Sequence, residues 1–543
     1  MAMTSSPTEA HEETFGIAPH VYHRRWLILS VLALSLITVV TAVSSLNVAL
    51  PTLARDLDAS SSDLQWILDA YALVFAGFLL PAGALGDRFG RRGALQVGLV
   101  IFGLAALVAS QSTTPDQVIA TRAVMGIGAA LIMPATLSII LTSFPMHERP
   151  KAIAIWAGCA GLGGALGPIS SGLLLEHFSW GSVFFINIPL VVALLVLSVI
   201  VLPSSKDPGA HPLDPPGAVL SVVGLVALVY GVIEGPPKGW TSPVVLGSFA
   251  LAAVALTAFV LVELRRRDPM LDPRLFKVKG FRSGSMAVTA AFFCMFGMFF
   301  LITQYLQFVK GYTPLQAGIR VVPSALCLLL VSPQSPRLVG RFGVRNVVTA
   351  GFVLVSIGLA LMSTYRADTP YIEVALGLVL MASGLAMVMP PSSQLIVGSL
   401  PLHKAGVGSA VNDVTREVGG ALGIAVLGSL LSSGYRRAVE DDVAGLPPAA
   451  ADAATDSIQG AMGVASELGE RGGALLASAS DAFTSATTVA FTAASLFVLV
   501  VGVAIARSMP NAVPTRQVPP EVSELDEIVD ECVPIDTAAA PIP

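Results

Sequence analysis

The sequence predicts a polytopic α-helical membrane protein, and three observations support this fold class. Of the 543 residues, 54% are hydrophobic and only 12% are charged, which is about half the charged fraction of a soluble domain. The mean hydropathy is +0.76. The apolar residues occur in blocks of 18 or more along most of the chain, and about 20 apolar residues form a helix that crosses a bilayer. The net charge of −5 gives no reason to expect nucleic-acid binding.

The apolar blocks predict about fourteen transmembrane helices, with boundaries that carry an error of a few residues. An even number of helices places both termini on the same side of the membrane. The predicted ranges are 26–48, 64–84, 93–111, 117–140, 152–175, 181–202, 215–234, 243–264, 284–308, 315–335, 346–365, 371–396, 407–432 and 482–506.

The distribution of basic residues predicts the orientation of these helices. With the N-terminus inside, the inner segments hold roughly three times as many Lys and Arg residues as the outer ones, and such a bias marks the cytoplasmic side. Residues 1–25 are polar and have acidic residues before HRR at 23–25, unlike a signal peptide. We therefore expect a short cytoplasmic N-terminal tail and a cytoplasmic C-terminus.

Two segments and the cysteines complete the organisation. Residues 434–481 are expected to form a long outer loop, and the acidic, Pro-rich residues 507–543 a disordered cytoplasmic tail. Four scattered cysteines and seven histidines without metal-ligand spacing predict neither a disulfide framework nor a metal site. No cofactor is expected.

An internal repeat divides the chain into two halves. GALGDRFGRR at 83–92 is echoed by RLVGRFGVR at 337–345, after the second helix of each proposed bundle. The chain is therefore read as a six-helix bundle at 26–202, two inserted helices with a basic cytoplasmic loop at 203–282, and a second six-helix bundle at 283–506. A parallel duplication of this kind places the substrate site at the interface of the halves, near the bilayer midplane.

Four blocks of sequence carry a resemblance to a known family. They are SSLNVALPTLARDL with WILDAYAL, the loop GALGDRFGRR, TRAVMGIGAALIMP, and GCAGLGGALGPISSG, at 44–57 with 66–73, 83–92, 121–134 and 158–172. The chain resembles the 14-spanner drug:proton antiporter family (EmrB/QacA type) of the major facilitator superfamily. The resemblance implies the major facilitator fold and the export of hydrophobic, often cationic, compounds in exchange for protons across a bacterial cytoplasmic membrane.

Asp69 and Arg122 are the candidates for proton coupling. Asp69 lies in the apolar run LQWILDAYALVF, and a carboxylate at membrane depth usually faces a cavity or a partner; a helix-end carboxylate that reaches the headgroups is the alternative. Arg122 lies at nearly the same depth in the fourth helix, so the two side chains could form a charge pair. In the family this arginine is tied to proton coupling, whereas a static pair would only fix the packing.

Other residues are candidates for conformational gating. In the loop at 83–92, Asp87 could pair with Arg88 or cap a helix, while Arg91 also fits the positive-inside bias. In the fifth helix, Gly164, Gly167 and Pro168 resemble the antiporter motif that seals the two halves together, although small residues also serve plain helix packing.

The thirteenth helix adds three further gating candidates. Asp413 and Arg416 are three residues apart and can pair on one face. Glu417 is then free to meet Arg88 or Arg91 across the bundle interface, which would form an inner gate.

One departure from the family bears on the number of acids. Members commonly have an acid five residues before the asparagine of NVALP, and here Ala42 takes that place before Asn47. Asp69 would then carry more of the coupling, with Glu373 as a possible second acid or a solvated helix end. We expect four polar or aromatic side chains to line the substrate cavity: Asn47, Trp66, Tyr71 and Gln304.

These observations predict a proton-coupled efflux transporter that works by alternating access, and not an enzyme. Its expected partners are small hydrophobic or cationic substrates, protons and the lipid bilayer. An uptake symporter of the same fold, or an exporter of a narrow lipid, siderophore or antibiotic substrate, remains the alternative.

Overall fold

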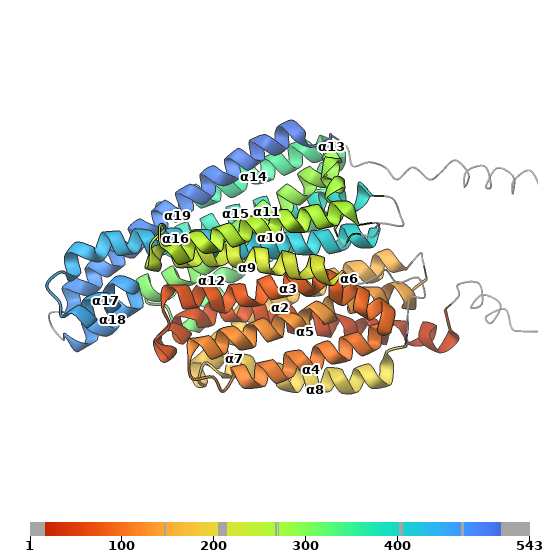
Figure 1. Cartoon of the computed structure of the whole chain (residues 1–543), viewed down its shortest axis with the longest axis horizontal. Coiled ribbons are helices and arrows are strands. Elements are labelled where there is room, and N and C mark those ends of the chain that lie inside the picture. Colours follow the sequence, from red (N-terminus) through yellow and green to blue (C-terminus); the bar gives the residue numbers. More distant parts are fainter. Residues whose placement is uncertain are drawn as a thin grey trace, which may run out of the picture.

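The computed structural model describes residues 17–145, 148–204, 214–266, 269, 271–400, 405–468 and 472–511. These residues form an elongated bundle of long helices that run side by side (Figure 1). At one end of the bundle lie α17 and α18, and we call it the cap end. At the other end, the terminal end, lie the first and the last described residues. The N-terminal residues 1–16 and the C-terminal residues 512–543, which include most of the predicted tails, are outside the described residues.

The first half of the chain forms a bundle of seven helices. Two of them begin at side-chain caps: Ser60 forms a capping box with Asp63 at the start of the second, and Thr114 precedes a proline in the first turn of the fourth. The helices are α2 (Pro19–Leu57), α3 (Ser61–Phe89), α4 (Arg91–Ala109), α5 (Pro115–Ser143), α6 (Arg149–His177), α7 (Ser182–Phe185) and α8 (Asn187–Val201).

A helical hairpin and a second bundle follow. The hairpin consists of α9 (Pro215–Lys238) and α10 (Pro243–Arg265). A short 3-10 segment (Pro273–Lys277) leads to the second bundle. Its elements are α11 (Lys279–Gln304) with a π-helical end (Tyr305–Val309), α12 (Pro314–Val331), a 3-10 turn (Ser332–Gln334), α13 (Ser335–Phe342), α14 (Val344–Met362), α15 (Tyr371–Gly398), α16 (Ala405–Val443), α17 (Pro448–Asp456), α18 (Ile458–Glu467) and α19 (Gly472–Ser508).

The structure confirms a helical membrane fold. Within the described residues, twelve helices or helix pairs are long and apolar enough to cross a membrane. Two further helices, α3 and α6, have 29 residues each, about 43 Å at the rise of an α-helix, which also suffices. Each of the fourteen predicted ranges therefore overlaps a helix or helix pair of sufficient length, although three of them, 93–111, 181–202 and 346–365, extend one to three residues past the observed ends.

Two segments differ from their predicted form. Helix α2 begins at Pro19, where a proline in the first turn favours a helix start, rather than at residue 26. Residues 434–481, expected as a loop, are mostly helical: α16 and α19 extend into this segment, and α17 and α18 lie between them. Alanine is frequent in this segment and is the strongest helix former, which explains the difference.

The internal repeat is visible in the backbone and its contacts. The helix after each repeat loop starts at a glycine with positive φ, 122° at Gly90 and 81° at Gly343, a region that favours glycine. Two residues further on, Arg92 donates to carbonyl groups at the end of α8. In the equivalent place, Arg345 donates to the carbonyl of Met509 at the end of α19. Each loop thus binds the end of the last helix of its own half.

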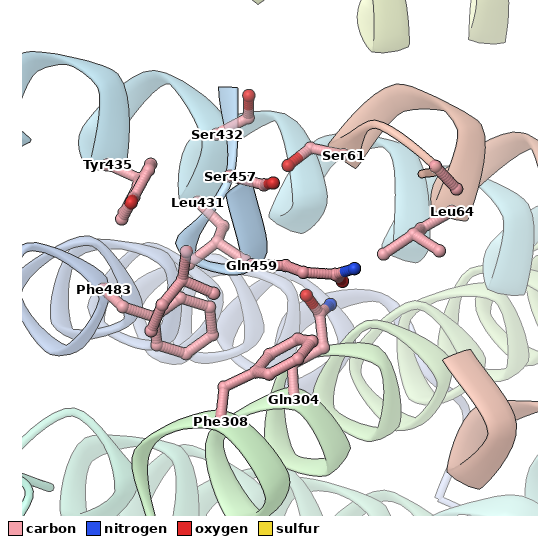
Figure 2. Close-up of a pocket in the computed structure, with 12 residues that line it drawn as sticks. Ser61, Leu64, Gln304, Phe308, Leu431, Ser432, Tyr435, Ser457, Gln459 and Phe483 are labelled. Atoms are coloured by element: carbon pink, nitrogen blue, oxygen red, sulfur yellow. The ribbon is translucent and has the colours of Figure 1, made fainter. Parts of the chain in front are cut away.

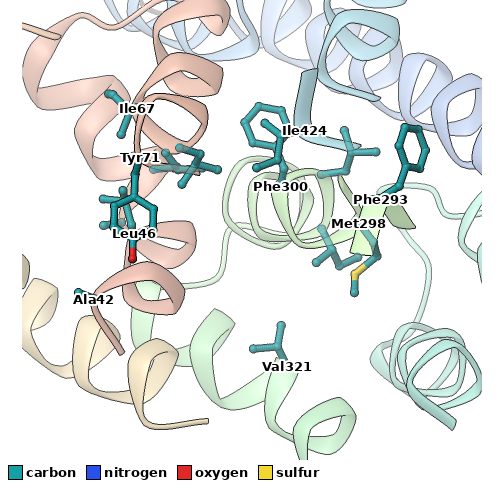
Figure 3. Close-up of a cluster of buried hydrophobic side chains, with 14 of the residues drawn as sticks. Ala42, Leu46, Ile67, Tyr71, Phe293, Met298, Phe300, Val321 and Ile424 are labelled. Atoms are coloured by element: carbon teal, nitrogen blue, oxygen red, sulfur yellow. The ribbon is translucent and has the colours of Figure 1, made fainter. Parts of the chain in front are cut away.

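A continuous apolar core joins the two halves. In Figure 3, Leu46, Ile67 and Tyr71 of the first half lie on one side of the cluster, and Phe300 and Ile424 of the second half lie on the other. All five side chains are buried. The interface between the halves is therefore mostly apolar, and the few polar groups within it are conspicuous.

The inserted hairpin lies at the junction of the two halves. Helix α9 packs against α10, against α3 of the first half and against α16 of the second, and in Figure 1 the hairpin crosses the boundary between the two bundles. A separate apolar cluster fills this three-helix seam. Its buried members are Ala72, Leu73, Val229, Ile233, Ala421 and Ala425.

Candidate functional site

Asp69 lies fully buried in the seam between α3, α9 and α16. Its exposed fraction is 0%, and neither carboxylate oxygen has a hydrogen-bond partner among the described residues. One turn before it, Gln65 faces Gly428 of α16, and one turn after it, Leu73 belongs to the apolar cluster of the seam. Residues four apart share a helix face, so Asp69 also faces the seam.

Arg122 is fully buried on α5 and contacts the opposite face of α3. Its Nε donates to the carbonyl of Ile67 at 3.1 Å, and its guanidinium lies 4.3 Å from the centre of the Tyr71 ring. Asp69 lies midway between these two residues in sequence, about 200° around the helix from each. The predicted Asp69–Arg122 charge pair is therefore not formed in this structure, although the two residues are at similar depth.

Gly126, which the sequence analysis did not name, helps to position Arg122. A Cβ atom on Gly126 would lie 2.7 Å from the carbonyl oxygen of Tyr71, which is closer than real Cβ contacts allow. The glycine one turn after Arg122 thus lets α5 approach α3 closely enough for the arginine to reach a backbone carbonyl. Its spacing of four from Arg122 was the available signal, since small residues mark close helix contacts.

Glu417 brings the second half of the chain to this site. The predicted pair of Asp413 and Arg416 is confirmed, with 3.5 Å between Oδ1 and Nη1, and Arg416 also lies over the ring of Phe292. Glu417 is close enough to Arg122 for their charges to interact across the two halves. In this conformation, Glu417 thus lies near the buried arginine of α5.

The predicted inner gate involves residues at the terminal end of α3. Arg88 lies in the last turn of the helix, with its guanidinium over the ring of Phe89. Arg91 opens α4. The side chain of Asp87 is outside the described part of the structure. A pairing of Glu417 with Arg88 or Arg91 therefore stays a prediction.

The glycine-rich helix α6 packs closely against α2. A Cβ on Gly167 would lie 2.7 Å from the amide nitrogen of Ser45, and Ser44 donates from its hydroxyl to the carbonyl of Gly163 at 3.1 Å. A Cβ on Gly164, in contrast, would meet no atom within 4 Å. Gly163 and Gly167 therefore serve the packing of the first half, and Gly164 points into open space in this conformation.

The last third of α6 contacts the second half directly. A Cβ on Gly172 would lie 2.5 Å from Cα of Leu315, and a Cβ on Gly318 would lie 2.5 Å from the carbonyl oxygen of Pro168. Both contacts join α6 to α12 close to the cap end. The segment from Pro168 to Gly172 thus forms a backbone-to-backbone contact between the halves in this conformation. Its role in gating stays a prediction.

Hydrogen bonds between the halves lie near the same end. Among the described residues, Gln307 Nε2 donates to the carbonyl of Val48 at 2.9 Å, and Thr313 Oγ1 donates to Glu176 at 2.8 Å. A third bond joins the hydroxyl of Ser61 to the cap, as described below. The two halves are therefore closed against each other at the cap end.

The cap covers this closed end. Ser61 Oγ donates to the carbonyl of Asp456 at the end of α17, which joins the cap to the first half. Beneath the cap, a cavity of about 20 Å³ is lined by Ser61, Gln304, Tyr435 and Phe483 among others (Figure 2). This is room for about one water molecule, so the cavity cannot hold a drug-sized compound.

The four residues predicted to line the substrate cavity have different surroundings in this conformation. Asn47 is buried with its Oδ1 unpaired among the described residues, and Tyr71 lies beneath Arg122. Gln304 lines the small cavity under the cap and donates to the carbonyl of Phe300. Trp66 donates from Nε1 to Glu234 of α9 at 3.2 Å.

The two positions linked to the missing first-helix acid are also clear. Residue 42 is a buried alanine, which has no acidic group. Glu373 is exposed in the first turn of α15, away from the seam, which fits a solvated helix end. Glu234 is the acid that sequence reasoning missed, because the end of its helix had the pattern of an ordinary polar boundary.

Comparisons with known proteins agree with this architecture. The model of the Major Facilitator Superfamily matches residues 32–424. The chain is 36% identical to the multidrug efflux pump LfrA of Mycolicibacterium smegmatis, over 89% of this chain and 97% of that protein. It is 33% identical to the tetracenomycin C resistance and export protein of Streptomyces glaucescens, over 95% and 98%. The methyl viologen resistance protein SmvA of Salmonella typhimurium is 35% identical, over 90% and 99%.

Solved structures confirm the fold alone, because the sequence identities are low. A bacterial homologue of the human lysosomal transporter Spinster, in an inward-facing and unoccupied conformation, superposes with a TM-score of 0.64 at 16% identity, over 90% of this chain and 98% of that one. A transporter of the POT family gives 0.63 at 14% identity, over 88% and 95%. Together with the matched family model and the long alignments to efflux pumps, these findings show that the chain belongs to the Major Facilitator Superfamily of membrane transporters, in its drug:proton antiporter type.

Proposed function

We propose that this protein exports hydrophobic drugs or secondary metabolites, cationic compounds among them, in exchange for protons. It would sit in a bacterial cytoplasmic membrane with both termini in the cytoplasm. The names of the relatives, which include a multidrug efflux pump and a methyl viologen resistance protein, support the substrate class. The excess of basic residues in the segments on the side of the termini supports the orientation.

With this orientation, the structure corresponds to a state that is closed toward the outside. The contacts of α6 with α12 and the cap all lie at the end opposite to the termini. In alternating access, the two bundles rock about a central site and open one end while they close the other. The contacts at Gly172 and Gly318 would then separate when the protein releases its substrate.

Asp69 is the single observation that carries proton coupling. The carboxyl group has neither a counter-charge at bonding distance nor a hydrogen-bond partner within the described structure. An ionised carboxylate in such surroundings costs several kcal/mol, whereas the neutral acid costs far less, so this state favours a bound proton. Rocking of the bundles would open the seam between α3 and α16 and hydrate the carboxyl group, which allows it to exchange its proton with water on the side that is open.

The charges of Arg122 and Glu417 would make the rocking motion depend on the charge of the bound substrate. They belong to different halves, and their charges interact in this conformation. Because α5 and α16 move with different bundles, rocking changes the distance between the two groups. A cationic substrate in the central cavity could then compete with Arg122, and with the neighbouring Arg416, for the negative charge of Glu417.

The test is substrate-triggered proton movement in proteoliposomes that hold the purified protein. The panel contains lipophilic monocations, dications and neutral antibiotics. We expect proton movement with at least one class in the wild type and its loss in Asp69→Asn, with Glu373→Gln as a matched control that keeps the signal. Efflux at the wild-type rate from Asp69→Asn would refute the assigned role.

A further inference from the structure

We propose that the inserted helix α9 is a working part of the coupling site: it forms the wall that covers Asp69, and Glu234 holds this wall in place. Glu234 is a positioning residue here, because it acts through Trp66 and does not touch Asp69. The geometry stands by itself, whereas its consequence for transport rests on the proposed function.

The position of α9 along α3 is fixed at two points on either side of Asp69. Towards the cap end, Trp66 Nε1 donates to Oε1 of Glu234 at 3.2 Å. Towards the terminal end, a Cβ on Gly77 would meet the side chain of Val222. The two helices run antiparallel, so the stretch of α9 between these points lies beside Asp69.

The surface that α9 presents to this stretch is apolar. Val229 and Ile233 have exposed fractions of 0% and pack with Ala421 and Ala425 of α16. This packing excludes water from the seam on the side of the inserted hairpin. The full burial of Asp69 therefore depends on a helix that belongs to neither bundle.

Neighbouring residues of α9 are bound to different halves of the chain. Glu234 accepts from Trp66 of α3, and two residues earlier the carbonyl of Val232 accepts from the hydroxyl of Ser429 of α16 at 2.9 Å. If α3 and α16 separate during transport, α9 cannot keep both bonds. The contacts of α9 with α3 and α16 must therefore change with the state of the transporter, and the burial of Asp69 must change with them.

Glu234 is well placed to determine how strongly α9 binds α3. Its Oε2 lies 3.1 Å from Nζ of Lys238, which also donates to the hydroxyl of Tyr230 at 2.8 Å. The bond from Trp66 is therefore made to a charged acceptor, which is stronger than a neutral one. The ring of Tyr230 lies 6.1 Å from that of Trp66 and adds packing to the same contact.

The competing explanation is a salt bridge at the helix rim with no further role. Lys238 and Glu234 are four residues apart on one helix, and the Lys238 side chain is 47% exposed, so this pair contributes little by itself. The two explanations differ in which partner matters. A covering role depends on Trp66, whereas a rim salt bridge depends on Lys238.

The experiment measures how fast a small water-soluble reagent reaches position 69. Asp69→Cys is made in a chain whose native cysteines, Cys159, Cys294, Cys327 and Cys532, are replaced by alanine. The purified protein is treated with a small water-soluble methanethiosulfonate, and the rate of labelling is followed by mass spectrometry. We expect Glu234→Ala and Trp66→Phe each to raise the rate by about tenfold, which corresponds to loss of one hydrogen bond to a charged group.

Two matched variants complete the set. Glu234→Gln keeps an oxygen acceptor for Trp66 but loses its charge, so it should label at a rate between those of the parent and Glu234→Ala. Lys238→Met removes the salt bridge and the bond to the Tyr230 hydroxyl but keeps the bond from Trp66, and should label at the slow rate. Equal rates in Glu234→Ala, Trp66→Phe and the parent would overturn the proposal, as would a fast rate in Lys238→Met with a slow rate in Trp66→Phe. If Glu234→Ala does not fold, Trp66→Phe tests the same bond from its other side.

The labelling result is independent of the proposed function, because Asp69→Cys does not need to transport. A failure of proton coupling would appear separately, as wild-type efflux from Asp69→Asn. Retention of slow labelling in that case would keep α9 as the cover of a buried carboxyl group whose role lies elsewhere.

Discussion

The buried guanidinium of Arg122 is bound to one bundle and has a free edge that could bind a group of the other. It is held to α3 by a hydrogen bond to a backbone carbonyl and by the face of an aromatic ring, while one of its terminal nitrogens has no hydrogen-bond partner in the described structure. A guanidinium suits this place better than an ammonium, because its plane can stack on a ring while its edge donates. The free edge is then available to a group from the other half or to substrate.

The contact with Tyr71 can be tested by keeping or removing the ring. We expect Tyr71→Phe to behave like the wild type, because the ring face that attracts the cation remains. Tyr71→Leu should lose about 2 kcal/mol, the size of a desolvated cation–π contact, and should lower the thermal midpoint measured with a thiol-reactive dye on the purified protein. Equal midpoints for the two variants would show that the ring does not stabilise Arg122.

Arg122→Lys tests the geometry of the same residue. Lysine keeps the charge but cannot donate along its edge while it stacks on the ring. We expect folded protein whose substrate-triggered proton movement falls at least about tenfold, the loss that corresponds to roughly 1.4 kcal/mol. Full activity of Arg122→Lys would mean that charge alone is required.

For single residues, the sequence predicts the position along the helix axis better than the helix face on which the side chain lies. The apolar run around residue 69 predicts a carboxylate inside the membrane, and Asp69 is fully buried within the bundle. The run is apolar on all sides, however, so it does not show which face of α3 meets α5 and which meets the seam. A rotation of about 200° separates a pair with Arg122 from the observed place, and only the packing of α9, α5 and α16 decides between them.

At the scale of the helices, the closed cap end depends on close contact between α6 and α12. Gly172 and Gly318 let the two backbones approach so closely that a methyl group at either position would meet main-chain atoms of the other helix. Main-chain atoms cannot move aside as a flexible side chain can. The closed state is therefore sensitive to one carbon atom, while the opposite state, in which these helices separate, is not.

We therefore expect Gly172→Ala to shift the protein toward the state that is open at the cap end. Overpacking of this kind costs about 1–3 kcal/mol, which only the closed state would bear. Spin labels on exposed residues of the two halves, introduced as Gln111→Cys and Asp368→Cys in the cysteine-free chain, would report a longer mean distance between them.

The control for this prediction lies on the same helix. A Cβ on Gly164 would meet nothing within 4 Å, so Gly164→Ala should leave the distance between the labels unchanged. An unchanged distance in Gly172→Ala as well would argue that α6 and α12 yield without separating.

The helices themselves were the most predictable part of the molecule. Each transmembrane range predicted from its apolar residues overlaps a helix or helix pair to within a few residues at its ends, since a chain in a bilayer must satisfy its backbone hydrogen bonds internally. The cap was not predicted, because α17 and α18 are short and carry no long apolar block. Their packing also depends on residues far away in sequence, such as Ser61.

At the scale of the whole molecule, the cap connects elements of both halves on the side where they close. It extends from α16 and α19 of the second half, and α17 ends against Ser61 of the first. At this contact, Asp456 pairs with Arg436 at the end of α16, and Tyr435 donates to the carbonyl of Ala454. The cap therefore reinforces the closed end through one charged contact that water can reach.

The acidity of Asp456 makes this contact dependent on pH. Burial raises the pKa of Asp456 above its ordinary value, although the charge of Arg436 opposes the shift, and Asp63 on the neighbouring helix adds to it. A carboxyl group whose pKa is higher in the folded state than in the unfolded state stabilises the fold at low pH and loses this contribution as the pH rises through the raised value. The docked cap should therefore be more stable in acid, the condition on the side from which protons would enter.

Hydrogen exchange of the amides in α17 and α18 measures this directly. After correction for the intrinsic exchange rate, we expect more protection at pH 5 than at pH 8 in the wild type. Asp456→Asn, which resembles the protonated acid and can still accept from Arg436, should keep the same protection at both values. Greater protection of the wild type at pH 8 would reverse the sign and show that the ion pair with Arg436 outweighs the cost of burying the charge.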